Sequence, residues 1–281
     1  MARGNLRPSC RENGRGIVGG VASRRIRRVL VVTQFALAII LLVGAGLLIG
    51  SLWSVENVDP GFRPERVLSM QLSSPAFRAS AQRADFCNRV LEQIEPLPGV
   101  ESAGIIGDLF VEGNPEQSLT TEGDARAIAE RLRFRRDEVS GGFFQALGTP
   151  LLRGRYFSAG DGPDSPRVAI LNDAMARRLW PGRDPLGRRF KLGPRDSNGP
   201  WFTVVGVVGD MRRQGLEREP VPQMFEPLAQ NPSRRVTLLV RTSTDDPLKM
   251  VGTIQAAVRR VEKHAPIYGV TTLENRLEGF L

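Results

Sequence analysis

Histidine and cysteine are scarce in this chain of 281 residues, which contains one histidine and two cysteines. The single histidine, His264, excludes an HExxH zinc site and most other sites built from clustered histidines. No Gly-Lys pair occurs, so a Walker A loop that would hold nucleotide phosphates is excluded. The sequence therefore indicates a protein that is not an enzyme. We identify no catalytic, cofactor-binding or metal-binding residue and expect no cofactor.

Charge is absent from the run Val29–Val55, which spans 27 residues without Asp, Glu, Lys or Arg. At about 1.5 Å per residue, a helix of this length exceeds the roughly 30 Å hydrocarbon core of a bilayer. A helix that is apolar on every face rarely belongs to a soluble domain, so the run predicts one transmembrane helix. Gly46 and Gly50 form a GxxxG pattern in it, which lets a second helix approach closely. Glycine is also simply common in membrane helices, and both explanations stay open.

Arginines around this helix predict its orientation. Five arginines lie before it, within residues 15–28, and only Arg63 and Arg66 lie in the first twenty residues after Leu52. This asymmetry predicts a cytoplasmic N-terminus and residues 56–281 outside the cytoplasm. A cleaved signal peptide is the alternative, but its apolar core is about 7–15 residues long and ends at a small-residue cleavage site. The run is longer and no clear A-x-A pattern follows it, so an uncleaved anchor is favoured.

The net charge of +9 comes mostly from residues 1–28, which contribute +7 and leave +2 for the rest. No DNA-binding pattern accompanies this basic tail, and attraction to anionic lipid at the cytoplasmic leaflet is the simpler explanation. We therefore expect membrane lipid as a partner and no nucleic acid. Cys10 and Cys87 would lie on opposite sides of the membrane and cannot pair. Cys87 falls in an amphipathic helix, where a small buried residue is expected.

Two strand–helix–strand patterns lie on either side of a different middle region. The first has a strand over 67–73, a helix over 79–95 and a strand over 100–106. The second has a strand over 236–241, a helix capped by Asp246 with Pro247 at its first position, and a strand over 268–273. Matching units that bracket another region suggest one split domain with an insertion. The middle contains short strands, a short helix over 173–180 and many Gly and Pro turns, which indicates a β-rich lobe.

Several polar and aromatic residues could belong to a site, and for each a structural role is favoured. A group of carboxylates could bind a cation or act as acid and base, but no ligand spacing is visible and a solvated loop is expected. His264 follows a helix end, where a cation suits the helix C-terminus. Gly206 and Gly209 lack the third glycine of a nucleotide-binding turn. The carboxylates are Asp108, Glu112, Glu116, Glu122 and Asp124, and the aromatic residues, expected in the core, are Phe143, Phe144, Trp180 and Trp201.

Five stretches resemble the MacB/FtsX-type ABC transporter permeases, particularly their duplicated "orphan permease" branch. In chain order they are RRVLVVTQFALAIILLVGAGLLIGSL at 27–52 with VDPGF at 58–62, LPGVESAG at 97–104, GGFFQALGTPLLRGRYF at 141–157, AILNDAMARRLWPGRDPLGRRFKLG at 169–193 and FTVVGVVGDMRRQGL at 202–216. Each alone is weak, but five in the family's order make a specific match that covers nearly the whole chain.

The resemblance implies an α+β fold in which one N-terminal transmembrane helix, residues 29–55, is followed by a MacB-like periplasmic core domain, residues 56–281. Within that domain it implies a split α/β lobe similar to the transporter porter fold, made of residues 66–137 and 236–275. A β-rich lobe, residues 138–235, would be inserted into it. The repeated strand–helix–strand pattern leads independently to the same division.

The resemblance also implies a mechanical function in a bacterial inner membrane. A separate cytoplasmic ABC ATPase would dimerise on ATP, and membrane helices would carry the motion to the periplasmic domain for export, including efflux, or for envelope work. Other permease helices or a second permease copy would be further partners. Family members continue into three more membrane helices, so this chain is expected to be a split, truncated or wrongly delimited piece that cannot couple to ATP alone. The alternative is a membrane-tethered extracytoplasmic binding or sensing module that works without ATP.

Overall fold

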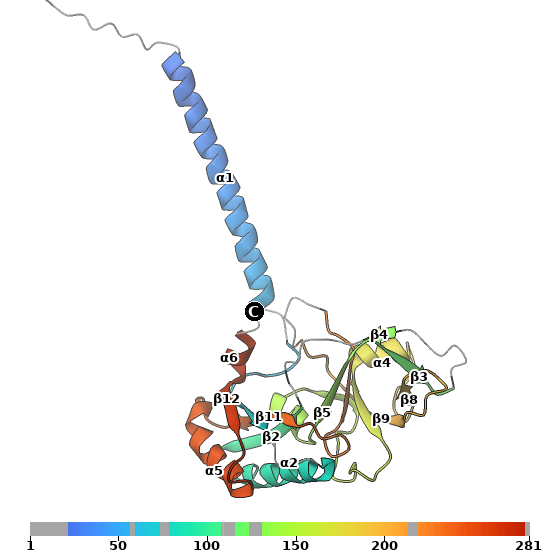
Figure 1. Ribbon diagram of the computed structural model, residues 1–281. Coiled ribbons are helices and arrows are strands. Elements are labelled where there is room, and N and C mark those ends of the chain that lie inside the picture. The colour runs from blue at the N-terminus through green and yellow to red at the C-terminus, as the bar shows by residue number, and fades with distance from the viewer. Residues whose placement is uncertain are drawn as a thin grey trace, which may run out of the picture. The chain divides into compact units, whose positions relative to one another are not determined.

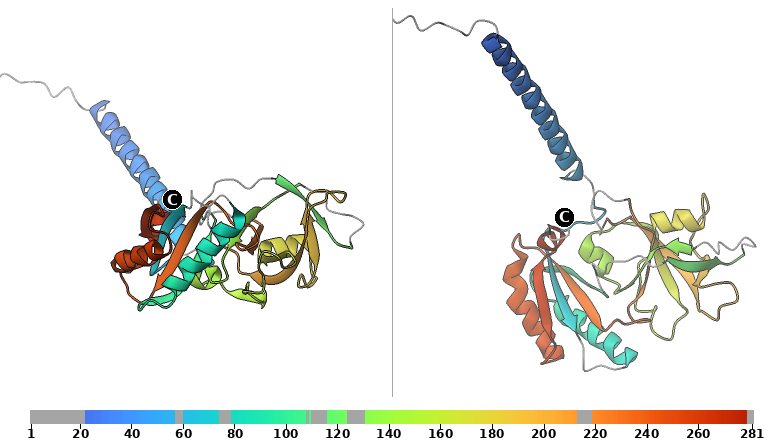
Figure 2. Two further views of the ribbon diagram at one scale, coloured as in Figure 1. Left: turned by 60° about the horizontal axis from the view of Figure 1, so that its bottom comes forward. Right: turned by 45° about the horizontal axis from the view of Figure 1, so that its top comes forward.

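The computed structural model describes residues 22–56, 60–73, 79–107, 109, 116–123, 131–212 and 219–278. It divides the chain into two units, the first ending at Asn57 and the second starting at Val58. Each unit is described by itself (Figure 1, Figure 2). The start of the basic tail, up to residue 21 and including Cys10, lies outside the described residues.

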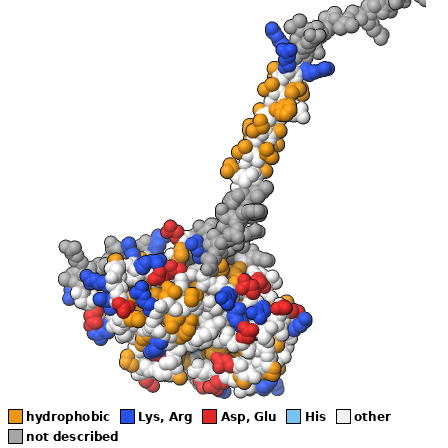
Figure 3. Space-filling model, turned by 180° about the vertical axis from the view of Figure 1, so that it is seen from behind, with side chains coloured by type: hydrophobic (Ala, Val, Ile, Leu, Met, Phe, Trp, Pro, Cys, Tyr) orange, Lys and Arg blue, Asp and Glu red, His pale blue; other side chains and the backbone are white. Residues whose placement is uncertain are grey.

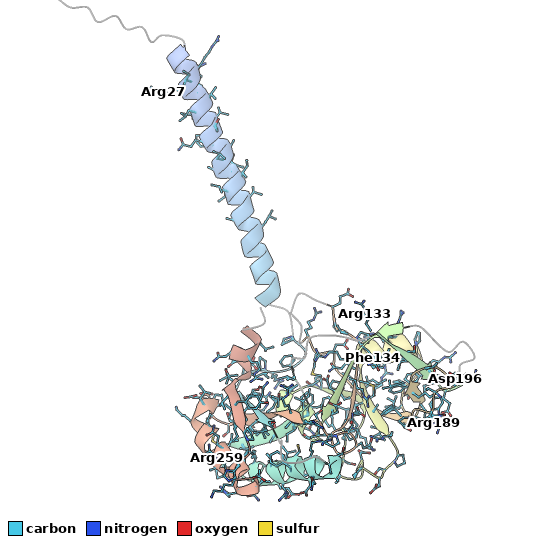
Figure 4. The ribbon with its side chains drawn as sticks, in the orientation of Figure 1. Arg27, Arg133, Phe134, Arg189, Asp196 and Arg259 are labelled. Carbon is cyan, nitrogen blue, oxygen red and sulfur yellow. The ribbon has the colours of Figure 1, made fainter. Side chains whose placement is uncertain are left out.

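The first unit contains one long helix, α1 (Ala22–Glu56). It includes the whole uncharged run, and its stretch Arg25–Leu47 is long and apolar enough to cross a membrane, with none of that stretch buried. Apolar side chains cover this part of the helix (Figure 3), and Arg27 lies near its first turns (Figure 4). The predicted helix is present, but it begins at Ala22 rather than Val29. Arginine has a high helix propensity, so the basic residues before the run join the helix.

The second unit combines strands and short helices. The strands are β1 (Val67–Ser73), β2 (Val100–Ile106), β3 (Glu116–Thr121), β4 (Arg131–Arg133), β5 (Arg135–Val139), β6 (Leu151–Gly154), β7 (Val168–Asn172), β8 (Arg189–Leu192), β9 (Trp201–Val208), β10 (Gln223–Pro227), β11 (Arg235–Thr242) and β12 (Ile267–Thr272). The helices are α2 (Ser80–Ile94), α3 (Phe143–Leu147), α4 (Asp173–Leu179), the 3₁₀ helix η1 (Pro247–Met250), α5 (Val251–Val261) and α6 (Leu273–Glu278). Within the described residues the strands join in the order β12-β1-β11-β2-β5-β10-β7-β9-β8-β3-β4, and β6 pairs with β9.

The two strand–helix–strand units interleave. β11 pairs antiparallel with both β1 and β2, and β1 pairs antiparallel with β12. β11 of the second strand–helix–strand unit therefore lies between β1 and β2 of the first. In the same way, β1 of the first lies between β11 and β12 of the second. Neither unit can complete its backbone hydrogen bonds alone, because the partner strands lie more than a hundred residues away in the sequence.

Apolar residues cover both faces of this four-stranded part. α2 and α5 lie on one face, where Phe86 and Ile254 pack in one buried cluster with Leu68 and Leu238 from the strands. Helix α3 lies against the other face (Figure 2). A Cβ at Gly104 would overlap the backbone of Phe143, so the glycine lets α3 approach β2 directly.

A second buried cluster surrounds β7, β8 and β9, and the predicted strands at 168–171 and 203–208 lie in it. Asn172 caps α4 by accepting a hydrogen bond from the amide of Met175 at 3.0 Å. The predicted acidic loop is partly wrong, because Glu116 begins β3, which pairs with β8. Leu119 of β3 is buried in the second cluster, and this single apolar residue stabilises the strand that the surrounding charges obscured.

Candidate functional site

The segment that follows α1 in the chain, residues 60–66, is here called the junction segment. Its sequence, PGFRPER, is rich in proline and forms neither helix nor strand. Backbone groups in such a segment stay unpaired unless other elements or water supply partners. The partners come from β11, from the end of α3 and from the turn after β9. Three parts of the second unit therefore hold the segment that leads from α1.

Arg241, on β11, is the central side chain of this site. Its Nε donates to the carbonyl oxygen of Ala146 at 3.0 Å. Its Nη1 and Nη2 donate to the carbonyl oxygens of Glu65 and Arg63, at 3.0 Å and 2.6 Å. The residue is only 9% exposed, and burial lowers the pKa of its guanidinium. An arginine stays charged in proteins, so these three carbonyls compensate for the burial of its charge.

Backbone bonds fix the rest of the junction segment to α3 and β11. The amide of Arg63 donates to the carbonyl oxygen of Leu147 at 2.7 Å. The amide and hydroxyl of Thr242 both donate to the carbonyl oxygen of Arg66, at 2.9 Å and 3.2 Å. Arg66 has a φ of 58°, which is uncommon for a residue with a side chain. The bonds from Thr242 hold it in this conformation.

The start of the junction segment contacts the turn after β9. The amide of Arg212 donates to the carbonyl oxygen of Pro60 at 2.9 Å. Gly61 has a φ of 77°, and a Cβ there would overlap the carbonyl oxygen of Asp210. The carboxylate of Asp210 in turn accepts from the amide of Ala174, in the first turn of α4, at 2.9 Å. Direct contacts through Asp210 therefore link the junction segment to α4.

Phe62 anchors the segment in the core and brings the sequence motifs together. It is 5% exposed and belongs to the same buried cluster as Leu147 and Met211. The stretches VDPGF, GGFFQALGTPLLRGRYF and FTVVGVVGDMRRQGL, far apart in the chain, thus meet here. Sequence reasoning missed Arg241, which it placed only at the end of a strand. The available signal was an arginine that ends an apolar strand.

The candidate polar residues do not meet in one site. His264 is exposed after α5, and its amide donates to Glu262 Oε1 at 3.3 Å. Glu122 forms an ion pair with Arg189 of β8, and Arg189 lies in the β-rich region (Figure 4). Asp108, Glu112 and Asp124 lie outside the described residues. In the part of the chain that the structure describes, no group of three or more His, Cys, Asp or Glu is placed to hold a metal ion.

The glycines, aromatic residues and cysteine that the sequence singled out have structural roles. A Cβ at Gly206 would overlap the backbone of Arg155, so this is a strand glycine with a close neighbour. Phe143, Phe144 and Trp180 are buried, as expected. Trp201 differs, because it is only half-buried and Arg189 and Lys191 lie over its ring. Cys87 is buried in α2, and burial raises the pKa of its thiol to about 12.

Several solved structures are similar to this chain. The periplasmic region of MacB from Actinobacillus actinomycetemcomitans matches with 14% identity and a TM-score of 0.50, over 80% of this chain and 96% of that one. A domain of a permease protein from Porphyromonas gingivalis matches with 15% identity and a TM-score of 0.46, over 75% and 92%. The extracellular domain of the noncanonic ABC-type transporter YknZ from Gram-positive bacteria matches with 16% identity and a TM-score of 0.42, over 74% and 97%. No curated protein sequence matches the chain.

A family model adds the sequence relationship to this likeness of fold. The model described as the MacB-like periplasmic core domain matches residues 35–260, from within α1 almost to the end of α5. The match includes the junction segment and every element that binds it. The chain belongs to the family of MacB-like periplasmic core domains.

Proposed function

We propose that this chain is the membrane-anchored extracytoplasmic part of an ABC transporter permease. In this proposal a separate cytoplasmic ATPase supplies ATP-driven motion, α1 carries it across a bacterial inner membrane, and residues 56–281 use it for export or envelope work. The chain itself supplies no catalytic group. The observation that carries the proposal is the binding of the junction segment by β11, α3 and the turn after β9, because a mechanical signal needs a rigid attachment at its point of arrival.

The orientation follows from charge. The basic residues Arg25, Arg27 and Arg28 begin the apolar part of α1 and are exposed, which suits the cytoplasmic surface of a membrane and its anionic lipid. A membrane-impermeant maleimide tests this in intact cells. We expect Arg259→Cys, on the exposed face of α5, to be labelled from outside, and the native Cys10 to be labelled only after permeabilisation. Labelling of Cys10 alone in intact cells contradicts the orientation.

We propose that α1 packs against other permease helices or against a second permease copy. A Cβ at Gly46 meets nothing within 4 Å, so the side of the helix on which Gly46 lies has room for the close approach of another helix. Gly46→Leu is expected to reduce disulfide crosslinking between cysteines placed in α1 and in the partner helix, whereas Leu47→Ile is not. Equal crosslinking in both variants contradicts this packing.

We also propose the lobe division, with a porter-like lobe over 66–137 and 236–275 and an inserted β-rich lobe over 138–235. Support comes from separate buried clusters around the α2/α5 face and around β7, β8 and β9, while a third cluster joins residues of both lobes, among them Leu239 and Phe225. Strands β3 and β4 pair toward β8, although they precede residue 138. Replacement of residues 138–235 by a short linker should leave the interleaved strand–helix–strand units folded. A remainder without cooperative unfolding contradicts the division.

A further inference from the structure

Two carboxylates, one buried and one half-buried, occupy neighbouring positions where β5 meets β10. These strands are parallel, and Glu138 of β5 is the register partner of Glu226 of β10. Parallel register partners present their side chains on the same face of a sheet. Glu226 is fully buried, and Glu138 lies in the same polar cluster. The pair lies next to residues 228–234, the connection that leads to β11.

One side chain bonds both carboxylates. Asn231 Nδ2 donates to Glu138 Oε1 at 3.2 Å and to Glu226 Oε1 at 3.0 Å. Ser233 donates its hydroxyl to Glu138 Oε2 at 2.9 Å. A Cβ at Gly107 would lie 2.6 Å from Glu138 Oε2, so the end of β2 closes the remaining side. The carboxylate of Glu138 therefore joins β5 to the 228–234 connection.

The charges around the pair do not balance. Arg136 donates from Nε to Glu226 Oε1 at 2.5 Å, which neutralises one carboxylate. Glu226 Oε2 is buried and has no hydrogen-bond partner. Asp137 of β5 adds a negative charge that is ion-paired with Arg135 at 3.9 Å, and burial followed by the charge of Glu226 raises the pKa of Glu138. On the connection, Asn231 and Ser233 are neutral, Arg234 is exposed, and Arg83 of α2 donates to the carbonyl oxygen of Pro232.

We propose that Glu138 and Glu226 form a binding site for one proton, and that its occupancy sets how firmly the 228–234 connection is held. A proton on Glu138 removes the repulsion between the carboxylates. Loss of the proton places a second negative charge beside Glu226, which Arg136 pairs only on one oxygen, and this loosens the connection. Because this connection leads into β11, which carries Arg241, pH acts on the same strand that binds the junction segment.

The sign of the pH dependence follows from the raised pKa of Glu138, whose ordinary value is 4.5. The folded chain binds this proton at a pH where the unfolded chain has released it. The proton on Glu138 therefore makes its full contribution to the free energy of unfolding when the pH is below the ordinary glutamate pKa. This contribution is lost as the pH rises through the pKa of Glu138 in the folded chain. Each unit of increase corresponds to a tenfold change in the protonation equilibrium.

Carbon-13 NMR of the full chain labelled at glutamate Cδ, in nanodiscs, tests the site directly. In the wild type we expect Glu138 to titrate above 4.5 and the protection of the amides of Leu228, Gln230 and Asn231 to fall through the same pH range. Glu226→Gln should lower the Glu138 midpoint, because it removes the neighbouring charge. Glu219→Gln, an exposed glutamate before β10, is the matched control and should leave the midpoint unchanged.

Several results overturn the proposal. The proposal is wrong if Glu138 of the wild type titrates with a midpoint at or below pH 4.5. It is also wrong if Glu226→Gln leaves the titration midpoint of Glu138 unchanged. Glu138→Gln should keep the 228–234 connection firmly held at all pH values. The amides of the connection should then be as protected as they are in the wild type at acidic pH. Calcium chloride at neutral pH should leave both glutamate signals in place, and a saturable shift of both would assign the site to a metal ion instead.

Discussion

Substitution of Arg241 by Met is expected to cost more stability than any exposed substitution in this domain. The change removes the donors for three carbonyl oxygens, those of Arg63, Glu65 and Ala146. A carbonyl left without a donor costs about 1–3 kcal/mol. Met fills similar space and avoids the burial of a charge, which offsets part of this loss. We therefore expect a net decrease of about 3–5 kcal/mol in the free energy of unfolding.

Equilibrium unfolding in urea, followed by tryptophan fluorescence of the full chain in nanodiscs, measures this loss. Arg260→Met, at an exposed position on α5, is the matched control and should stay within about 0.5 kcal/mol of the wild type. Arg241→Lys keeps the charge but loses the planar set of guanidinium donors. Its loss in the free energy of unfolding should therefore lie between the losses of Arg260→Met and Arg241→Met. Hydrogen exchange adds a local readout, because the amide of Arg63 should lose protection in Arg241→Met. A loss below about 1 kcal/mol with unchanged protection of that amide refutes the role given to Arg241.

Three further predictions concern single residues. Gly61→Ala should destabilise the chain by about 2–4 kcal/mol, because its Cβ overlaps Asp210, whereas Gly123→Ala, with a similar φ and open space, should cost about 1 kcal/mol in the same urea assay. Cys87, whose pKa is raised to about 12 by burial, should react with maleimide at neutral pH only after unfolding, and rapid labelling of the folded chain contradicts its burial. The Arg155 guanidinium lowers the pKa of Asp161, so that pair should stabilise the fold above the ordinary carboxyl pKa and lose its effect as the pH falls through the depressed value. Asp161→Asn should remove this loss of stability at acidic pH. If the free energy of unfolding of Asp161→Asn depends on pH as that of the wild type does, the stabilising role of the pair is wrong.

The elements that sequence reasoning identified are those in which local pattern and tertiary packing agree. The helix over 79–95, the helix begun by Asp246 and Pro247, and the strands that open and close both units all have a regular apolar face, and each is present. Strands β3, β4, β5, β6, β8 and β10 were missed. They are short and charged, and they are stabilised by partners distant in the sequence rather than by their own pattern.

The junction site could be predicted only in part. Proline and glycine at residues 60–64 indicated a connector, and the family resemblance singled out VDPGF, but nothing local linked these residues to Arg241. That pairing spans 178 residues between the Nη2 of Arg241 and the carbonyl of Arg63. The Glu138–Glu226 pair was equally hidden, since each glutamate alone resembles an ordinary surface residue and only the parallel register brings them together.

We propose that ATP-driven motion reaches residues 56–281 of this chain. The most direct test is a pulsed electron–electron double resonance measurement in lipid, with the chain, its permease helices and a candidate ABC ATPase reconstituted together. Spin labels are attached at Arg259→Cys, on α5, and at Asp196→Cys, between β8 and β9, and both positions are exposed. The two labels thus report on the α5 end and the β8 end of the sheet. Cys10 and Cys87 are replaced by Ser in this protein. We expect the distance distribution recorded with ATP and vanadate to differ from the distribution recorded without nucleotide. Identical distributions in the two states, while ATP is being hydrolysed, contradict it.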